Sequence, residues 1–117
     1  MAVSPSQTRR HVEAMQAAKR ASADRRAAAL RARLPALAAE LRATAGVRDI
    51  VLFGSFARGD VHEESDVDLA VSGLAPARYS AALGRCCAIL SYDVHLIELE
   101  AAGASLRARI EVEGVAL

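Results

Sequence analysis

The chain has 117 residues, 53% of them hydrophobic and 25% charged, with a formal net charge of +1, which allows one small domain with a single core. Aromatic residues make up 3% of the chain and tryptophan is absent, which argues against a base-stacking surface for single-stranded nucleic acid. No apolar run approaches the roughly 18 residues of a membrane span and the N-terminus lacks the apolar segment of a secretory signal, so we expect a cytoplasmic protein without membrane contacts.

The first 34 residues are predicted to form a basic helical extension. They are rich in alanine and arginine, which are strong helix formers, and Ser6 is the expected N-cap. Residues 1–34 contain eight Lys or Arg and two acidic residues, whereas residues 35–117 contain seven basic and twelve acidic ones. Because large apolar residues are scarce, this extension either binds a partner, such as a nucleic acid through residues 9–33, or is a solvated helix that packs in an oligomer or against nothing.

Residues 35–117 are predicted to form the folded domain. Pro35 either kinks the first helix or occupies the first turn of a second one. A leucine stripe with spacings of four, three and four runs through this proline and predicts a helix face that covers a sheet: Leu30, Leu34, Leu37 and Leu41. Gly46 is the expected C-cap of this helix.

A buried strand, Asp49–Phe53, is predicted to end in the dipeptide Gly54-Ser55. Glycine permits a tight turn and lets a ligand approach the backbone closely. Ser55 is the expected N-cap of a short helix. Free backbone N–H groups at the start of that helix predict a small anion site.

The second strand, Asp66–Ser72, places two carboxylates on one face. Asp66 and Asp68 alternate with apolar residues that face the other side of the sheet. Two neighbouring carboxylates repel each other unless a cation lies between them. Mg²⁺ is the natural candidate because it prefers hard oxygen ligands and substrate phosphates.

Two helices and a third strand complete the predicted domain. A helix that begins at Pro76 places Cys86 and Cys87 as small core residues rather than reactive thiols. The third strand, Tyr92–Leu99, carries Asp93 at its start, where it is either a third carboxylate of the site or a cap of the preceding turn. A last helix, Ala104–Glu113, turns Leu106 and Ile110 to one face.

The spacing of these motifs resembles a known signature. Gly54-Ser55, ten intervening residues and then Asp66-Val67-Asp68 are similar to the motif of the DNA polymerase β-like nucleotidyltransferase superfamily. Ala57-Arg58-Gly59 and the closing run from Ile110 to Val115 resemble its smallest members, the minimal nucleotidyltransferases (MNT). The resemblance covers about residues 35–117.

The resemblance implies an α/β (α+β) fold: a small mixed β-sheet with helices packed on one face, a polymerase β-like nucleotidyltransferase fold preceded by the basic helical arm. It also implies a site. Asp66, Asp68 and Asp93 would be the catalytic carboxylates and the ligands of two Mg²⁺ ions. Gly54 and Ser55 would bind the phosphates of ATP, and Arg58 would face the phosphates or the acceptor.

The resemblance further implies a partner. Many minimal nucleotidyltransferases are antitoxins that transfer AMP from ATP to a tyrosine of a HEPN-domain ribonuclease toxin. Two other interpretations stay open: a nucleotidyltransferase with a small-molecule or RNA acceptor, and a non-catalytic module that neutralises a partner by contact alone. The expected partners are therefore a HEPN toxin, a second copy of the chain, or a nucleic acid.

Overall fold

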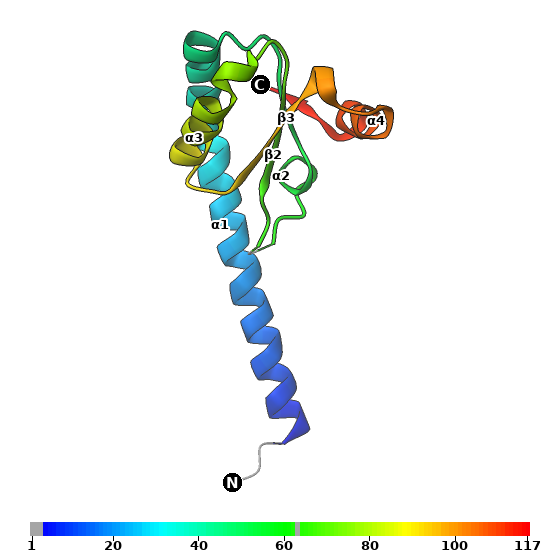
Figure 1. Cartoon of the computed structure of the whole chain (residues 1–117). Helices are drawn as coiled ribbons and strands as arrows, with labels where there is room; N and C mark the ends of the chain where they lie inside the picture. The colour runs from blue at the N-terminus through cyan, green and yellow to red at the C-terminus, as the bar shows by residue number, and fades with distance from the viewer. Residues whose placement is uncertain (1–3, 63) are drawn as a thin grey trace.

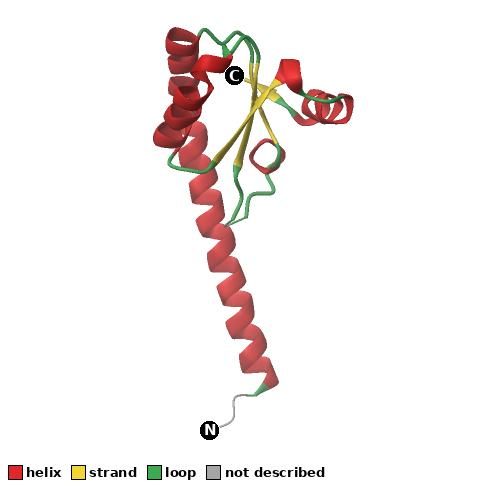
Figure 2. Ribbon diagram, in the orientation of Figure 1, coloured by secondary structure: helices red, strands yellow, loops and turns green. Residues whose placement is uncertain are grey.

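A four-stranded sheet of order β3-β2-β1-β4 forms the centre of the domain (Figures 1 and 2). The computed structural model describes residues 4–62 and 64–117. β1 pairs with β2 and β4 in antiparallel fashion, and β2 pairs with β3 in parallel, so the predicted mixed sheet is confirmed. The strands are β1 Ile50–Phe53, β2 Val67–Val71, β3 Val94–Glu98 and β4 Val115–Ala116.

The first helix, α1, spans Pro5–Ala45 and begins earlier than expected. Its N-cap is Ser4, whose side chain accepts a hydrogen bond from the Gln7 N–H while the Gln7 side chain accepts one from the Ser4 N–H. The prediction of Ser6 as the cap is wrong, because Pro5 is preorganised for the first helical position and moves the start forward. Gly46 is the C-cap, as predicted, with φ 69° and ψ 21°.

The helix continues through Pro35 without interruption, which excludes the alternative that this proline begins a second helix. The leucine stripe on both sides of the proline explains the continuity. Leu30, Leu34, Leu37 and Leu41 are all buried in one core cluster. Tertiary packing of this face stabilises a helix that intrinsic propensity would interrupt.

The N-terminal half of α1 projects away from the domain (Figure 1). Among the described residues, Ala23 is the first that is buried. Two arginines of the basic extension point back to the domain: Arg31 donates to the Phe56 carbonyl at 3.4 Å, and Arg33 donates to the Leu90 carbonyl at 3.4 Å. The basic extension is therefore anchored at its C-terminal end and exposed at its N-terminal end.

α1 and α3 (Tyr79–Leu90) cover one face of the sheet. The main core joins Leu37 of α1 and Cys86 of α3 to Leu52, Leu69 and the other inward residues of the strands. α3 follows the short 3₁₀ turn η1 (Pro76–Arg78). Burial raises the pKa of the Cys86 thiol to about 11, which supports its interpretation as a core residue.

The opposite face is partly covered by α4 (Ala104–Glu113), which follows the 3₁₀ turn η2 (Leu99–Ala101). Ile110 of α4 forms a second, smaller cluster with Phe53 and Ala70. α4 leads into β4, a two-residue strand that the sequence analysis did not predict and that pairs with β1. The polar end of this second face, beyond α4, carries the predicted carboxylates.

No helix within residues 4–62 and 64–117 combines the length and the apolar character that a membrane crossing requires.

Candidate active site

The turn after β1 brings the backbone of Gly54 against β2. Gly54 adopts φ 75° and ψ −156°, a conformation that side chains rarely allow. A Cβ at this position would overlap the Oδ2 of Asp68 and lie 3.0 Å from its Cγ. The glycine is therefore required both by its backbone angles and by its close approach to a predicted catalytic carboxylate.

Gly54, not Ser55, is the N-cap of the short helix α2 (Ser55–Arg58), so the predicted capping role of Ser55 is wrong. The Gly54 carbonyl accepts hydrogen bonds from the N–H groups of Ala57 and Arg58 at 3.1 and 3.0 Å. Because the glycine already supplies the non-helical backbone before the helix, Ser55 occupies its first position instead. Ser55 stays half-buried at the turn, where its hydroxyl is free of a capping role.

The predicted carboxylate pair lies on the polar end of the second sheet face. Asp68 pairs with Phe53 of β1 on one side and with His95 of β3 on the other. Partial burial raises the pKa of Asp68, and the nearby His95 and Arg109 oppose that rise. The side chain of Asp66, just before β2, is more exposed, at 44% against 23% for Asp68.

His95 lies between the two carboxylates. Its Nδ1 is 3.3 Å from Asp68 Oδ1 and its Nε2 is 3.6 Å from Asp66 Oδ2. The sequence analysis did not assign a role to this histidine. The available signal was the alternation of β3, which places His95 on the same face as Asp93, but only the strand register shows which carboxylates it meets.

Asp93 lies one residue before β3, and its carbonyl accepts a hydrogen bond from the Val67 N–H at 3.0 Å. Since Val67 pairs with Val94, Asp93 and Asp66 precede paired residues of neighbouring parallel strands. Asp93 is exposed. Within the described part of the chain, no three His, Cys, Asp or Glu side chains are arranged to hold a metal ion, so the role of Asp93 stays a prediction.

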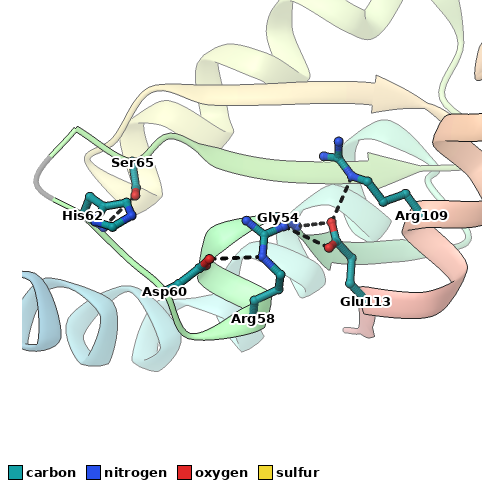
Figure 3. A network of polar contacts seen from close by, with 7 residues as sticks. All are labelled: Gly54, Arg58, Asp60, His62, Ser65, Arg109 and Glu113. Carbon is teal, nitrogen blue, oxygen red and sulfur yellow. Dashed lines mark hydrogen bonds and ion pairs between the residues drawn. The ribbon is translucent and has the colours of Figure 1, made fainter.

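Arg58 is placed beside the turn, at the end of α2. Its Nε is 3.3 Å from Asp60 Oδ2, and its Nη1 donates to Glu113 Oε2 at 2.9 Å. Figure 3 shows that the Glu113 carboxylate also faces Gly54 and Arg109. Glu113 and Arg109 belong to α4 and were not predicted as part of the site, because nothing in the local sequence links that helix to the turn.

A cleft of about 610 Å³ lies next to the loop that follows α2. One wall is the exposed part of α1, with Lys19 and Arg20, and the other is the loop around Asp60 and His62. The basic extension therefore borders the same loop that carries the Arg58 partner Asp60.

Comparison with known proteins gives a consistent result. The family model described as "Polymerase beta, Nucleotidyltransferase" matches residues 36–117. A search of curated proteins finds no match. The matched segment begins within α1 and contains the turn, the carboxylates and α4.

Solved structures resemble a large part of the chain. A protein described as a minimal nucleotidyltransferase is 29% identical, with a TM-score of 0.68, over 78% of this chain and 95% of that one. A chain of a toxin–antitoxin complex with AMP-PNP is 27% identical, with a TM-score of 0.60, over 72% of this chain and 68% of that one. A chain of a mutant MntA–HpeT toxin–antitoxin complex is 28% identical, with a TM-score of 0.57, over 66% of this chain and 64% of that one.

Proposed function

The chain belongs to the polymerase beta nucleotidyltransferase family, and from that premise we propose that it transfers AMP from ATP to a tyrosine of a HEPN ribonuclease toxin, as the antitoxin of that toxin. The observation that carries the proposal is the close approach of the Gly54 backbone to the Asp68 carboxylate. A phosphate-binding backbone and a metal-binding carboxylate would then lie side by side. Similarity to toxin–antitoxin structures, one of them with AMP-PNP, supports the partner and the nucleotide.

The turn and Arg58 would hold the phosphates of ATP. The Gly54 N–H points toward the position that the Glu113 carboxylate now takes, and Arg58 faces the same position. Both groups are charge-complementary to phosphate oxygens. Ser55, at the first position of α2, lies at the same turn and would add a hydroxyl donor.

The carboxylates of Asp66 and Asp68 have the oxygen donors that Mg²⁺ prefers, and their partial exposure leaves room for substrate phosphates in the coordination shell. Bound Mg²⁺ ions would neutralise charge on the attacking and leaving oxygens. We propose that Asp93, at the same end of the neighbouring strand, completes this ligand set.

In the proposed reaction the tyrosine oxygen forms a bond to the α-phosphorus of ATP. The bond between that phosphorus and the bridging oxygen breaks, and pyrophosphate leaves. Asp93 is the proposed acceptor of the hydroxyl proton. The site is open enough for a residue on a protein surface, since 64% of the His95 side chain above the carboxylates is exposed.

The test is label transfer. The purified chain is incubated with α-labelled ATP, Mg²⁺ and the product of the adjacent gene, in parallel with an Asp66→Asn/Asp68→Asn variant. We expect label on a tyrosine of the partner with the wild type only, located by peptide mass spectrometry. Label on RNA or a small molecule would contradict the proposed acceptor. No label, with equally tight partner binding by wild type and variant, would instead show neutralisation by contact.

A further inference from the structure

The Glu113 carboxylate accepts hydrogen bonds from both sides of the site. The Oε1 of Glu113 accepts hydrogen bonds from the Gly54 N–H at 3.1 Å and from Arg109 Nε at 3.2 Å. Its Oε2 accepts one from Arg58 Nη1 at 2.9 Å. Only 13% of the Glu113 side chain is exposed, so this carboxylate fills the space between the turn and α4 (Figure 3).

The electrostatics show that Glu113 behaves as a bound anion. The hydrogen bond from Arg58 is the largest cause of a lowered pKa for the Glu113 carboxyl. The same hydrogen bond is the largest cause of a raised pKa for Arg58. At neutral pH the turn therefore already holds a negatively charged group in contact with two guanidinium groups.

Arg109 extends this anion site toward the carboxylates. Its guanidinium carbon lies 5.8 Å from the centre of the Phe53 ring, and Phe53 is the strand partner of Asp68. The charge of Arg109 also opposes the rise that burial causes in the pKa of Asp68. Arg109 thus lies over the sheet beside Phe53, next to both the turn and Asp68.

The backbone of Glu113 is held in place by the residues that follow it. The next residue, Gly114, donates its N–H to the Ile110 carbonyl at 2.8 Å. A Cβ on Gly114 would overlap the Ile110 oxygen and Val51 Cγ1, so the chain packs tightly here. β4 then pairs with β1 through Val115. Release of the carboxylate would therefore come from a change of the Glu113 rotamer and not from a movement of the backbone.

We propose that Glu113 occupies the phosphate site of the nucleotide in the empty protein, and that a triphosphate replaces it and takes over Arg58 and Arg109. Arg109 is then a phosphate-binding residue supplied by the last helix. The inference rests on the proposed function and adds two elements to it. These are Arg109 as a phosphate-binding residue and the replacement of the Glu113 carboxylate by the triphosphate. A triphosphate carries more charge than a carboxylate and offers more acceptor oxygens to the two arginines.

The test is the affinity for AMP-PNP with Mg²⁺, and separately for inorganic triphosphate, measured by calorimetry. Glu113→Gln is expected to tighten binding about two- to fivefold, because it removes a competing charge of ion-pair strength. Glu111→Gln is the control, with the same charge change at an exposed position of α4. Arg109→Gln is expected to weaken binding about tenfold, and Arg107→Gln, also exposed on α4, is its control.

Weaker or unchanged binding by Glu113→Gln would overturn the inference, because it would make Glu113 a support of the arginines and not their competitor. If that variant fails to fold, a crystal structure of the wild type with AMP-PNP decides. The Glu113 carboxylate must then have left the Gly54 N–H, and its persistence there would overturn the inference. Tight AMP-PNP binding without AMP transfer would contradict only the proposed function.

Discussion

His95 and Asp68 are paired across the parallel strands β3 and β2, with His95 Nδ1 3.3 Å from Asp68 Oδ1. The same imidazole reaches Asp66 through its other nitrogen, at 3.6 Å. A protonated His95 relieves the repulsion between two carboxylates on one sheet face. The imidazole of His95 thus contacts both of the proposed metal ligands on this face.

The ionisation of Asp68 should lower the stability of the fold. Its pKa is raised by burial, so the folded chain binds more protons than the unfolded chain between the usual value of about 3.9 and the raised value. The stabilising contribution is complete below the usual value and is lost as the pH rises through the raised one. We expect Asp68→Asn to melt at or above the wild-type temperature at pH 7, and the difference to shrink toward pH 4. A wild type more stable than Asp68→Asn at pH 7 would contradict this.

Asp93→Asn should reduce AMP transfer with little effect on folding. The residue is exposed, so its charge contributes little to stability, whereas loss of a metal ligand or proton acceptor costs about tenfold or more in rate. Transfer rate and Mn²⁺ affinity, by calorimetry, are the measurements. Glu64→Gln, an exposed loop carboxylate, is the matched control. Equal activity of Asp93→Asn and the control would show that Asp93 is neither a metal ligand nor a proton acceptor and only belongs to the turn before β3.

Two glycines with positive φ allow a matched test of the Gly54 turn. Gly46→Ala places a methyl group in open space at φ 69°, so we expect a loss of about 1 kcal/mol in unfolding free energy and normal transfer. Gly54→Ala adds an overlap with Asp68 at φ 75°. We expect it to cost more than about 2 kcal/mol and to abolish transfer. Urea denaturation gives the energies, and similar losses for the two variants would contradict the close-approach argument.

Pro35→Ala should stabilise the protein. The proline lies inside α1, is exposed, and cannot donate to the Arg31 carbonyl. Alanine restores that donor, and the gain outweighs the lost rigidity of the unfolded chain, so we expect about 1–2 kcal/mol more stability by urea denaturation. A less stable Pro35→Ala variant would mean that the proline ring contributes packing to α1.

The exposed half of α1 should be dispensable for folding. Deletion of residues 1–21 removes no buried residue from the part of the chain that the structure describes. We expect the unfolding free energy of the variant without residues 1–21 to differ from that of the wild type by less than about 1 kcal/mol. We expect the affinity of this variant for the partner to fall. Deletion of residues 1–31 is the contrast, because it removes Leu30 from the core and should cost about 2–5 kcal/mol for that side chain alone. Unchanged partner affinity in the shorter deletion would exclude residues 1–21 as a binding element.

Local patterns were sufficient for much of the domain. The spacing of the apolar residues in β2 predicts which face carries Asp66 and Asp68, and the burial of Val67 and Leu69 confirms it. The glycine of the turn and the α4 boundaries were also predicted correctly. Strand alternation and turn chemistry depend on neighbouring residues only, so one sequence suffices to establish them.

Local rules failed where two of them competed. Ser4 and Ser6 are both good caps, and the rigid ring of Pro5 favours the earlier one. At Pro35 the packing of Leu34 and Leu37 overrides a strong helix breaker. Such outcomes depend on the energies of contacts with the sheet, which propensities do not contain.

By itself the sequence determined the turn, the carboxylate pair and their resemblance to nucleotidyltransferases, because these features lie within a few residues of one another. Only the tertiary structure decided what surrounds them. It places His95 between the carboxylates through parallel pairing, and Glu113 against Gly54, 59 residues away, through the return of the chain along β1. Contacts between distant segments follow from how helices and strands pack together, and that packing is a property of the whole chain.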